Sequence, residues 1–121
     1  MRPLLALLLL LASPAWAQRG GCGLGEGLAG LASAEEMLAA PSPGLEAGRD
    51  QAAQASAGLY QAQATLLRCG CRRLAEPVAE AAGLADQARS QASMADLRRS
   101  LDRARFSLRL AREKAGRDGC S

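Results

Sequence analysis

The sequence predicts an all-α fold in which two disulfide-closed helical hairpins form a small four-helix, or bent three-helix, bundle. Ala and Leu dominate the composition, and the only β-branched residues are Val78 and Thr65. Helices favour such a composition, whereas sheets favour β-branched and aromatic residues. Apolar residues recur at helical spacing, and four cysteines divide the chain at nearly equal intervals. At 121 residues the chain is long enough for one domain.

The first segment, residues 1–17, has the pattern of a cleavable signal peptide. Arg2 supplies a positive start, Leu4 to Leu11 form an apolar run, and Ala15-Trp16-Ala17 fits a small-x-small cleavage site. We therefore expect cleavage after Ala17 and a periplasmic or secreted product. The run is short for a membrane span, so we expect no transmembrane segment in the mature chain. Loss of Arg2 lowers the formal net charge from +3 to +2.

The next segment, residues 18–32, is rich in glycine, which disfavours a helix, and we expect an irregular N-terminal arm. Leu24, Leu28 and Leu31 recur at helical spacing, so the alternative is that its later part joins the first helix once packed. Ser33 and Glu36 fit a capping box, so the first helix is predicted to begin at Ser33. Pro41 ends it. Ser42 is predicted to cap the second helix, with Pro43 at its first position. Residues 33–69 then form helical hairpin 1.

The second predicted helix, which runs to about Arg68, carries a regular apolar seam of the kind found in coiled coils. Large and small residues alternate along it at heptad spacing, so a neighbouring helix can approach closely. The seam consists of Leu45, Gly48, Ala52, Ala55, Leu59, Ala62, Leu66 and Cys69. It therefore places Cys69 on the buried edge at the end of the helix.

Residues 71–120 form helical hairpin 2 in this interpretation, and residues 33–120 form a single domain. Its first seam comprises Leu74, Val78, Ala81, Ala85, Ala88, Ala92 and Ala95, and its second Met94, Leu97, Leu101, Ala104, Leu108, Ala111 and Ala115. Gly83 and the stretch from Ser90 to Ser93 are candidate breaks between them. The alternative is one unbroken helix of about 66 Å, longer than its partner helices would cover. This length favours a break.

The four cysteines allow three pairings. A bridge from Cys69 to Cys71 would close a strained ring. We prefer Cys22 with Cys69 and Cys71 with Cys120, which closes each hairpin separately. Cys22 with Cys71 and Cys69 with Cys120 is a close alternative. Such bridges suit an exported protein, because thiols oxidise outside the cytoplasm.

Cys69-Gly70-Cys71 also permits a different function, that of a periplasmic thiol-redox or soft-metal-binding protein. Cys71 would then lie at a helix start beside Arg72 and Arg73, a setting that lowers the pKa of a thiol. No thioredoxin-like strand and helix pattern surrounds the pair, and the chain has no His to assist a metal. We therefore expect structural disulfides, with no metal site and no cofactor.

The charged residues contain no acid–base constellation that predicts catalysis, so we expect no catalytic residues and no enzyme activity. From Asp96 to Asp118 eight basic residues face four acidic ones. We predict a solvated helix face. The alternative is weak contact with anionic surfaces, through Arg98, Arg99, Arg103, Arg105, Arg109 and Arg112. Export and the scarcity of aromatic residues argue against nucleic acid as a partner.

Four large apolar residues lie off the seams, namely Tyr60, Leu67, Phe106 and Leu110. They either pack against the other hairpin or form a partner-binding patch, and we expect packing. The sequence as a whole predicts a small exported, non-enzymatic binding or structural protein, with an unidentified protein partner in the cell envelope.

Overall fold

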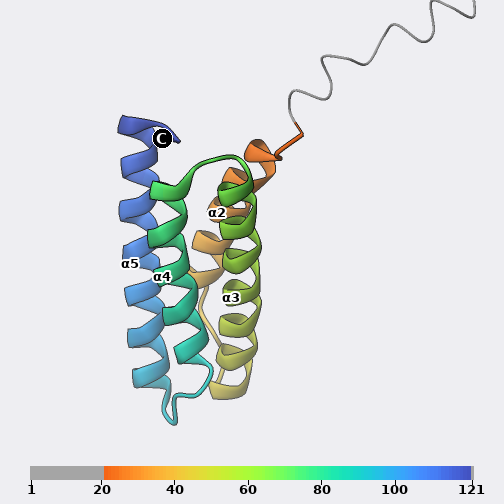
Figure 1. Cartoon of the computed structure of the whole chain (residues 1–121). Coiled ribbons are helices and arrows are strands. Elements are labelled where there is room, and N and C mark those ends of the chain that lie inside the picture. Colours follow the sequence, from red (N-terminus) through yellow and green to blue (C-terminus); the bar gives the residue numbers. More distant parts are fainter. Residues whose placement is uncertain (1–20, 121) are drawn as a thin grey trace, which may run out of the picture.

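The computed structural model describes residues 21–120, so the predicted signal peptide lies outside the described residues. The described part is all-helical and consists of α2 (Leu24–Ala39), α3 (Leu45–Arg68), α4 (Arg72–Ala88) and α5 (Met94–Asp118). Successive helices run in opposite directions, as Figure 1 shows. Both α2 and α4 pack against α3 and α5, which closes a four-helix bundle. The bent three-helix alternative is not adopted, because residues 89–93 form a turn between α4 and α5.

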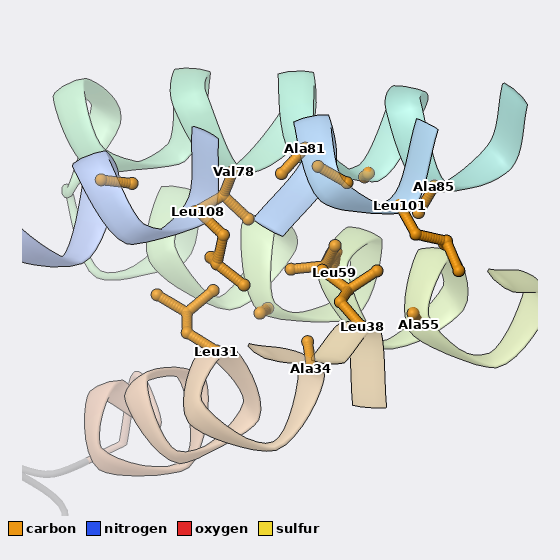
Figure 2. Close-up of a cluster of buried hydrophobic side chains, with 14 of the residues drawn as sticks. Leu31, Ala34, Leu38, Ala55, Leu59, Val78, Ala81, Ala85, Leu101 and Leu108 are labelled. Atoms are coloured by element: carbon orange, nitrogen blue, oxygen red, sulfur yellow. The ribbon is translucent and has the colours of Figure 1, made fainter. Parts of the chain in front are cut away.

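The bundle core follows the predicted seams closely. In α3 every seam residue from Gly48 to Leu66 is buried, and in α5 every seam residue from Leu97 to Ala111 is buried. Leu31, Leu59 and Leu108 are buried in the core, where Leu31 of α2 and Leu108 of α5 point toward one another (Figure 2). Alternation of large and small residues brings the helix axes close together, which an alanine-rich core requires.

The start of α2 differs from the prediction. The helix begins at Leu24, so Ser33 lies inside it and the expected capping box at Ser33 and Glu36 is wrong. A tertiary contact explains the difference. A Cβ added to Gly27 would lie 3.1 Å from Thr65 Cγ2, so glycine lets α2 approach α3 closely at this point. Hairpin 1 therefore extends over the predicted N-terminal arm.

The predicted start of α3 was also wrong. Gly44, and not Ser42, is the residue before the helix, and it makes no side-chain cap. The Ser42 hydroxyl instead donates a hydrogen bond to the side-chain oxygen of Gln51 and accepts one from Arg98. The amide of Gln51 in turn donates to the carbonyl oxygens of Met37 and Ala40, at the end of α2. Ser42 therefore helps to hold the α2–α3 turn.

The break between α4 and α5 lies at Ser90–Ser93, one of the two predicted places. Gly83, the other candidate, continues α4. The Ser93 hydroxyl accepts a hydrogen bond of 3.1 Å from the Asp96 backbone N–H, which caps α5. Because the chain turns here, Ala92 and Ala95 are exposed, and their predicted place in the seam was wrong.

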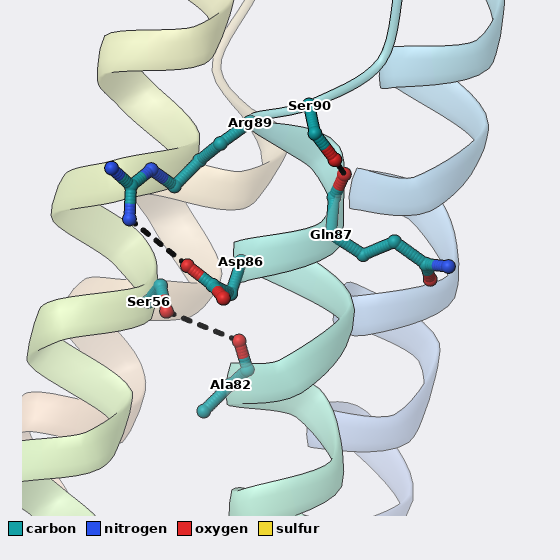
Figure 3. A network of polar contacts seen from close by, with 6 residues as sticks. All are labelled: Ser56, Ala82, Asp86, Gln87, Arg89 and Ser90. Atoms are coloured by element: carbon teal, nitrogen blue, oxygen red, sulfur yellow. Dashed lines mark hydrogen bonds and ion pairs between the residues drawn. The ribbon is translucent and has the colours of Figure 1, made fainter.

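One buried hydrogen bond joins α3 to α4 within the core. The Ser56 hydroxyl donates to the carbonyl oxygen of Ala82 over 3.2 Å (Figure 3). The other polar contacts in that view lie at the exposed end of α4, where Arg89 pairs with Asp86. The core therefore accepts the Ser56 hydroxyl because a carbonyl oxygen of the next helix satisfies it.

Candidate functional site

All four cysteines lie at one end of the bundle, which we call the disulfide pole. Cys22 is bonded to Cys69, with a Cα–Cα distance of 5.1 Å, and Cys71 to Cys120, with 4.9 Å. This is the pairing preferred from the spacing. Gly70 separates the bridges and adopts a positive φ of 78°, which favours glycine, and this lets α3 end and α4 begin within three residues.

The bridged state leaves no free cysteine among residues 21–120. Cys71 is fully buried, and Cys22, Cys69 and Cys120 are partly buried. In the same part of the chain, no group of three acidic or Cys side chains lies close enough together to hold a metal ion. The disulfide pole is therefore arranged as a covalent clamp on the helix ends.

The four off-seam apolar residues are exposed, so the expectation that they pack against the other hairpin was wrong. The exposed fractions are 46% for Tyr60, 48% for Leu67, 61% for Phe106 and 48% for Leu110. Each helix already fills its share of the core with its own seam, which leaves no inward place for these side chains. They fall into two groups, one on α3 and one on α5.

Phe106 and Leu110 line a groove along the boundary of α4 and α5, which we call the α4–α5 groove. Its larger hollow, of about 870 Å³, extends from Ala95 to Leu110 along α5. A second hollow shares Pro77, Glu80 and Leu110 with it and continues to Lys114. Because the two hollows share these residues, they form one continuous groove.

The α4 side of this groove was missed by the sequence analysis. Pro77 and Leu84 contribute its apolar part, and Glu80 lies between them. These three residues are spaced by three and four, so they share one helix edge. That edge lies beside the α4 seam, and its spacing is the feature that could have identified it.

The six arginines predicted to contact anionic surfaces do not share one face. Arg98, Arg105 and Arg112 are seven residues apart, and two of them reach α2. Arg98 donates to the carbonyl oxygen of Ala40 over 3.4 Å, and Arg112 forms an ion pair with Glu35. The Nε atom of Arg105 is buried without a hydrogen-bond partner among the described residues.

The remaining three arginines are exposed on α5. Arg99 pairs with Asp96 over 3.1 Å, and Arg99 and Arg103 line the α4–α5 groove beside Phe106. Arg109 is exposed beside Leu110 and does not line the groove. The predicted basic stripe is thus divided between an intramolecular role on the α2 side and a surface role around Phe106.

The fold and these features define the class: a disulfide-linked all-α four-helix bundle with an open apolar groove between α4 and α5. The chain was compared with protein families, with characterised proteins and with solved structures, and none of these three comparisons finds a match. None of the helices within residues 21–120 combines the length and apolar character that a membrane span requires.

Proposed function

We propose that this chain is a small exported, non-enzymatic binding module, held by its two disulfides, that contacts a protein partner of the cell envelope through the α4–α5 groove. The observation that carries the proposal is the exposure of Phe106. Phe106 is 61% exposed and lies in a groove with Leu110. A partner that covers this aromatic side chain removes apolar surface from water, which lowers the free energy of the complex.

Two further observations support an exported protein. The pattern of residues 1–17 is that of a cleavable signal peptide. The two bridges, Cys22–Cys69 and Cys71–Cys120, are of a kind that persists in oxidising compartments. Sequencing of the protein recovered from the exported fraction tests this part. The proposal expects a mature N-terminus at Gln18, and a retained residue 1 contradicts it.

The binding role is tested by photo-crosslinking in cells that export the protein. A photoreactive residue at position 106 is expected to give a discrete crosslinked product. The same residue at position 57, an exposed alanine of α3 outside the groove, is the control. Equal crosslinking from both positions, or none from position 106, would contradict the groove as the contact surface.

The competing function, thiol-redox or soft-metal chemistry at Cys69-Gly70-Cys71, makes a different prediction. It requires at least one bridge to open under physiological conditions. A count of free thiols in the unreduced, denatured protein distinguishes the two functions. A count of zero supports structural bridges, whereas two reactive thiols would favour the redox or metal function.

A further inference from the structure

We propose that the occupant of the α4–α5 groove is an amphipathic helix of the partner, with one acidic and one basic flank. This inference rests on the proposed function and names the kind of partner. It follows from three properties of the groove, namely its length, its openness and the charges of its two walls.

The length and openness favour a helix over a small ligand. From Ala95 to Lys114 the groove follows α5 for about 28 Å, at about 1.5 Å per residue, roughly the length of the bundle's own helices. It is open along one side, so a small molecule would stay largely in solvent, whereas small-molecule sites bury most of the ligand surface. A boundary between two antiparallel helices is where a further helix packs.

The apolar residues of the groove suit such a helix. Pro77 and Leu84 lie two turns apart on α4, and Phe106 and Leu110 lie one turn apart on α5, so the four form an apolar patch within the groove. An amphipathic helix places apolar side chains at i, i+3, i+4 and i+7, which form one stripe. That stripe would cover Phe106, the most exposed of the large apolar side chains.

The two walls carry opposite charge. The α5 wall presents Arg98, Arg99, Arg103 and Lys114 against Asp102. Arg98 is engaged by the Ala40 carbonyl oxygen and Arg99 by Asp96, so Arg103 and Lys114 carry the unpaired positive charge of this wall. The α4 wall presents Glu76 and Glu80 against Arg73. Asp102 and Arg73 offset part of this difference, but the excess on each wall remains. A helix with acidic residues along one flank and basic residues along the other complements both walls, and the wall charges then determine the direction in which it lies.

The test uses three designed helical peptides of about 18 residues with one leucine stripe and equal helicity. One has a glutamate flank and a lysine flank, one has two glutamate flanks, and one has two lysine flanks. We expect the mixed peptide to bind the oxidised mature protein about fivefold more tightly than either uniform peptide, because each uniform peptide meets one wall of like charge.

Variants of the protein locate the binding. Phe106→Asp is expected to weaken binding of the mixed peptide about tenfold or more, because it places a charge under the leucine stripe. Tyr60→Asp, at an exposed aromatic of α3 outside the groove, is the matched control and should leave the affinity unchanged. Both sites are exposed, and circular dichroism of each variant checks that the fold is retained.

Charge reversal of the α4 wall gives the sharpest result. Glu76→Lys with Glu80→Lys makes both walls basic, so the peptide with two glutamate flanks should become the tightest binder. An unchanged order of affinities would overturn the inference, as would a lack of binding by all three peptides. If position 106 crosslinks to a partner in cells while the peptides fail, the proposed function stands and the helical occupant is rejected.

A second copy of this chain is the other occupant that the groove could hold, and the oligomeric state tests it. Sedimentation of the mature protein should show a monomer that Phe106→Asp leaves unchanged. A concentration-dependent dimer that Phe106→Asp abolishes would mean that a second copy, and not a partner helix, covers the groove.

Discussion

Arg98 of α5 donates hydrogen bonds to the carbonyl oxygen of Ala40, the residue that follows α2, over 3.4 Å. The same guanidinium reaches the carbonyl oxygen of Leu38 over 3.5 Å and the Ser42 hydroxyl over 3.2 Å. The last carbonyl groups of a helix have no partner within it, and a cation at that end also meets the negative end of the helix dipole. A side chain 58 residues away in sequence therefore caps α2.

Replacement of this arginine is expected to lower stability. Arg98→Ala should reduce the free energy of unfolding by about 1–2 kcal/mol, because the carbonyl groups of Leu38 and Ala40 lose a charged donor and Ala40 keeps only the bond from Gln51. Chemical denaturation followed by circular dichroism measures the change. Arg109→Ala, at an exposed arginine of the same helix that has no partner among residues 21–120, is the control and should be nearly neutral. Equal losses from both would contradict the capping role.

Ser93, which caps α5, and Ser33, which was expected to cap the first helix, give a direct contrast. Ser93→Ala should lower the free energy of unfolding by about 1 kcal/mol, because the Asp96 N–H loses its acceptor. Ser33→Ala should cause no loss, because Ser33 lies inside α2 and alanine is the better helix former there. Thermal and urea denaturation of both variants measure the difference. A comparable loss from Ser33→Ala would place the start of the helix at Ser33 after all.

These two serines show what local sequence can and cannot predict. Ser93 follows a turn, and α5 begins directly after it, as its capping pattern indicates. Ser33 stands in an equally good capping pattern. Upstream of it, however, Gly27 packs against Thr65 and Cys22 is bonded to Cys69, so the helix begins before Ser33. Glycine is unfavourable in an isolated helix but permits close contact in a packed one, and propensity alone does not distinguish these cases.

The core and the groove also differ in how far the sequence could predict them. Heptad spacing predicted the buried seams of α3 and α5 because every member faces the same direction, whatever its neighbours are. Whether Phe106 is covered depends on where α4 lies relative to α5, which spacing within α5 does not contain. The exposed face of Phe106 and the α4 wall at Leu84 therefore became visible only in the assembled bundle.

Two glycines of α3 are expected to respond differently to alanine. Gly58→Ala should raise the free energy of unfolding by up to about 1 kcal/mol, because the added Cβ meets no atom within 4 Å and alanine favours the helix. Gly48→Ala gains the same propensity, but its Cβ would lie 3.1 Å from a Leu97 methyl group. We expect a smaller gain or a loss. Equal gains, measured by urea denaturation, would show that Leu97 moves aside freely.

Removal of one bridge is expected to lower stability while the helices remain. Cys22→Ser with Cys69→Ser opens a loop that spans 47 residues in sequence. In the chain-entropy model such a bridge contributes about 4 kcal/mol, and measured values are often lower. The melting temperature should fall markedly, while the helical circular dichroism signal at low temperature changes little. An unchanged melting temperature would mean that the bridge adds nothing to stability.

The confinement of both disulfides to one pole gives the bundle two unequal ends. At the opposite end only non-covalent contacts join the turns, among them the hydrogen bond of 2.7 Å from Arg49 to the carbonyl oxygen of Gln91. Thermal fluctuations should therefore separate the helices first at that end, and amide hydrogens there should exchange with solvent sooner than those near the sulfur atoms. Since the groove extends from Ala95 near the looser end towards the clamped one, a partner that needs extra width would enter from the Ala95 side.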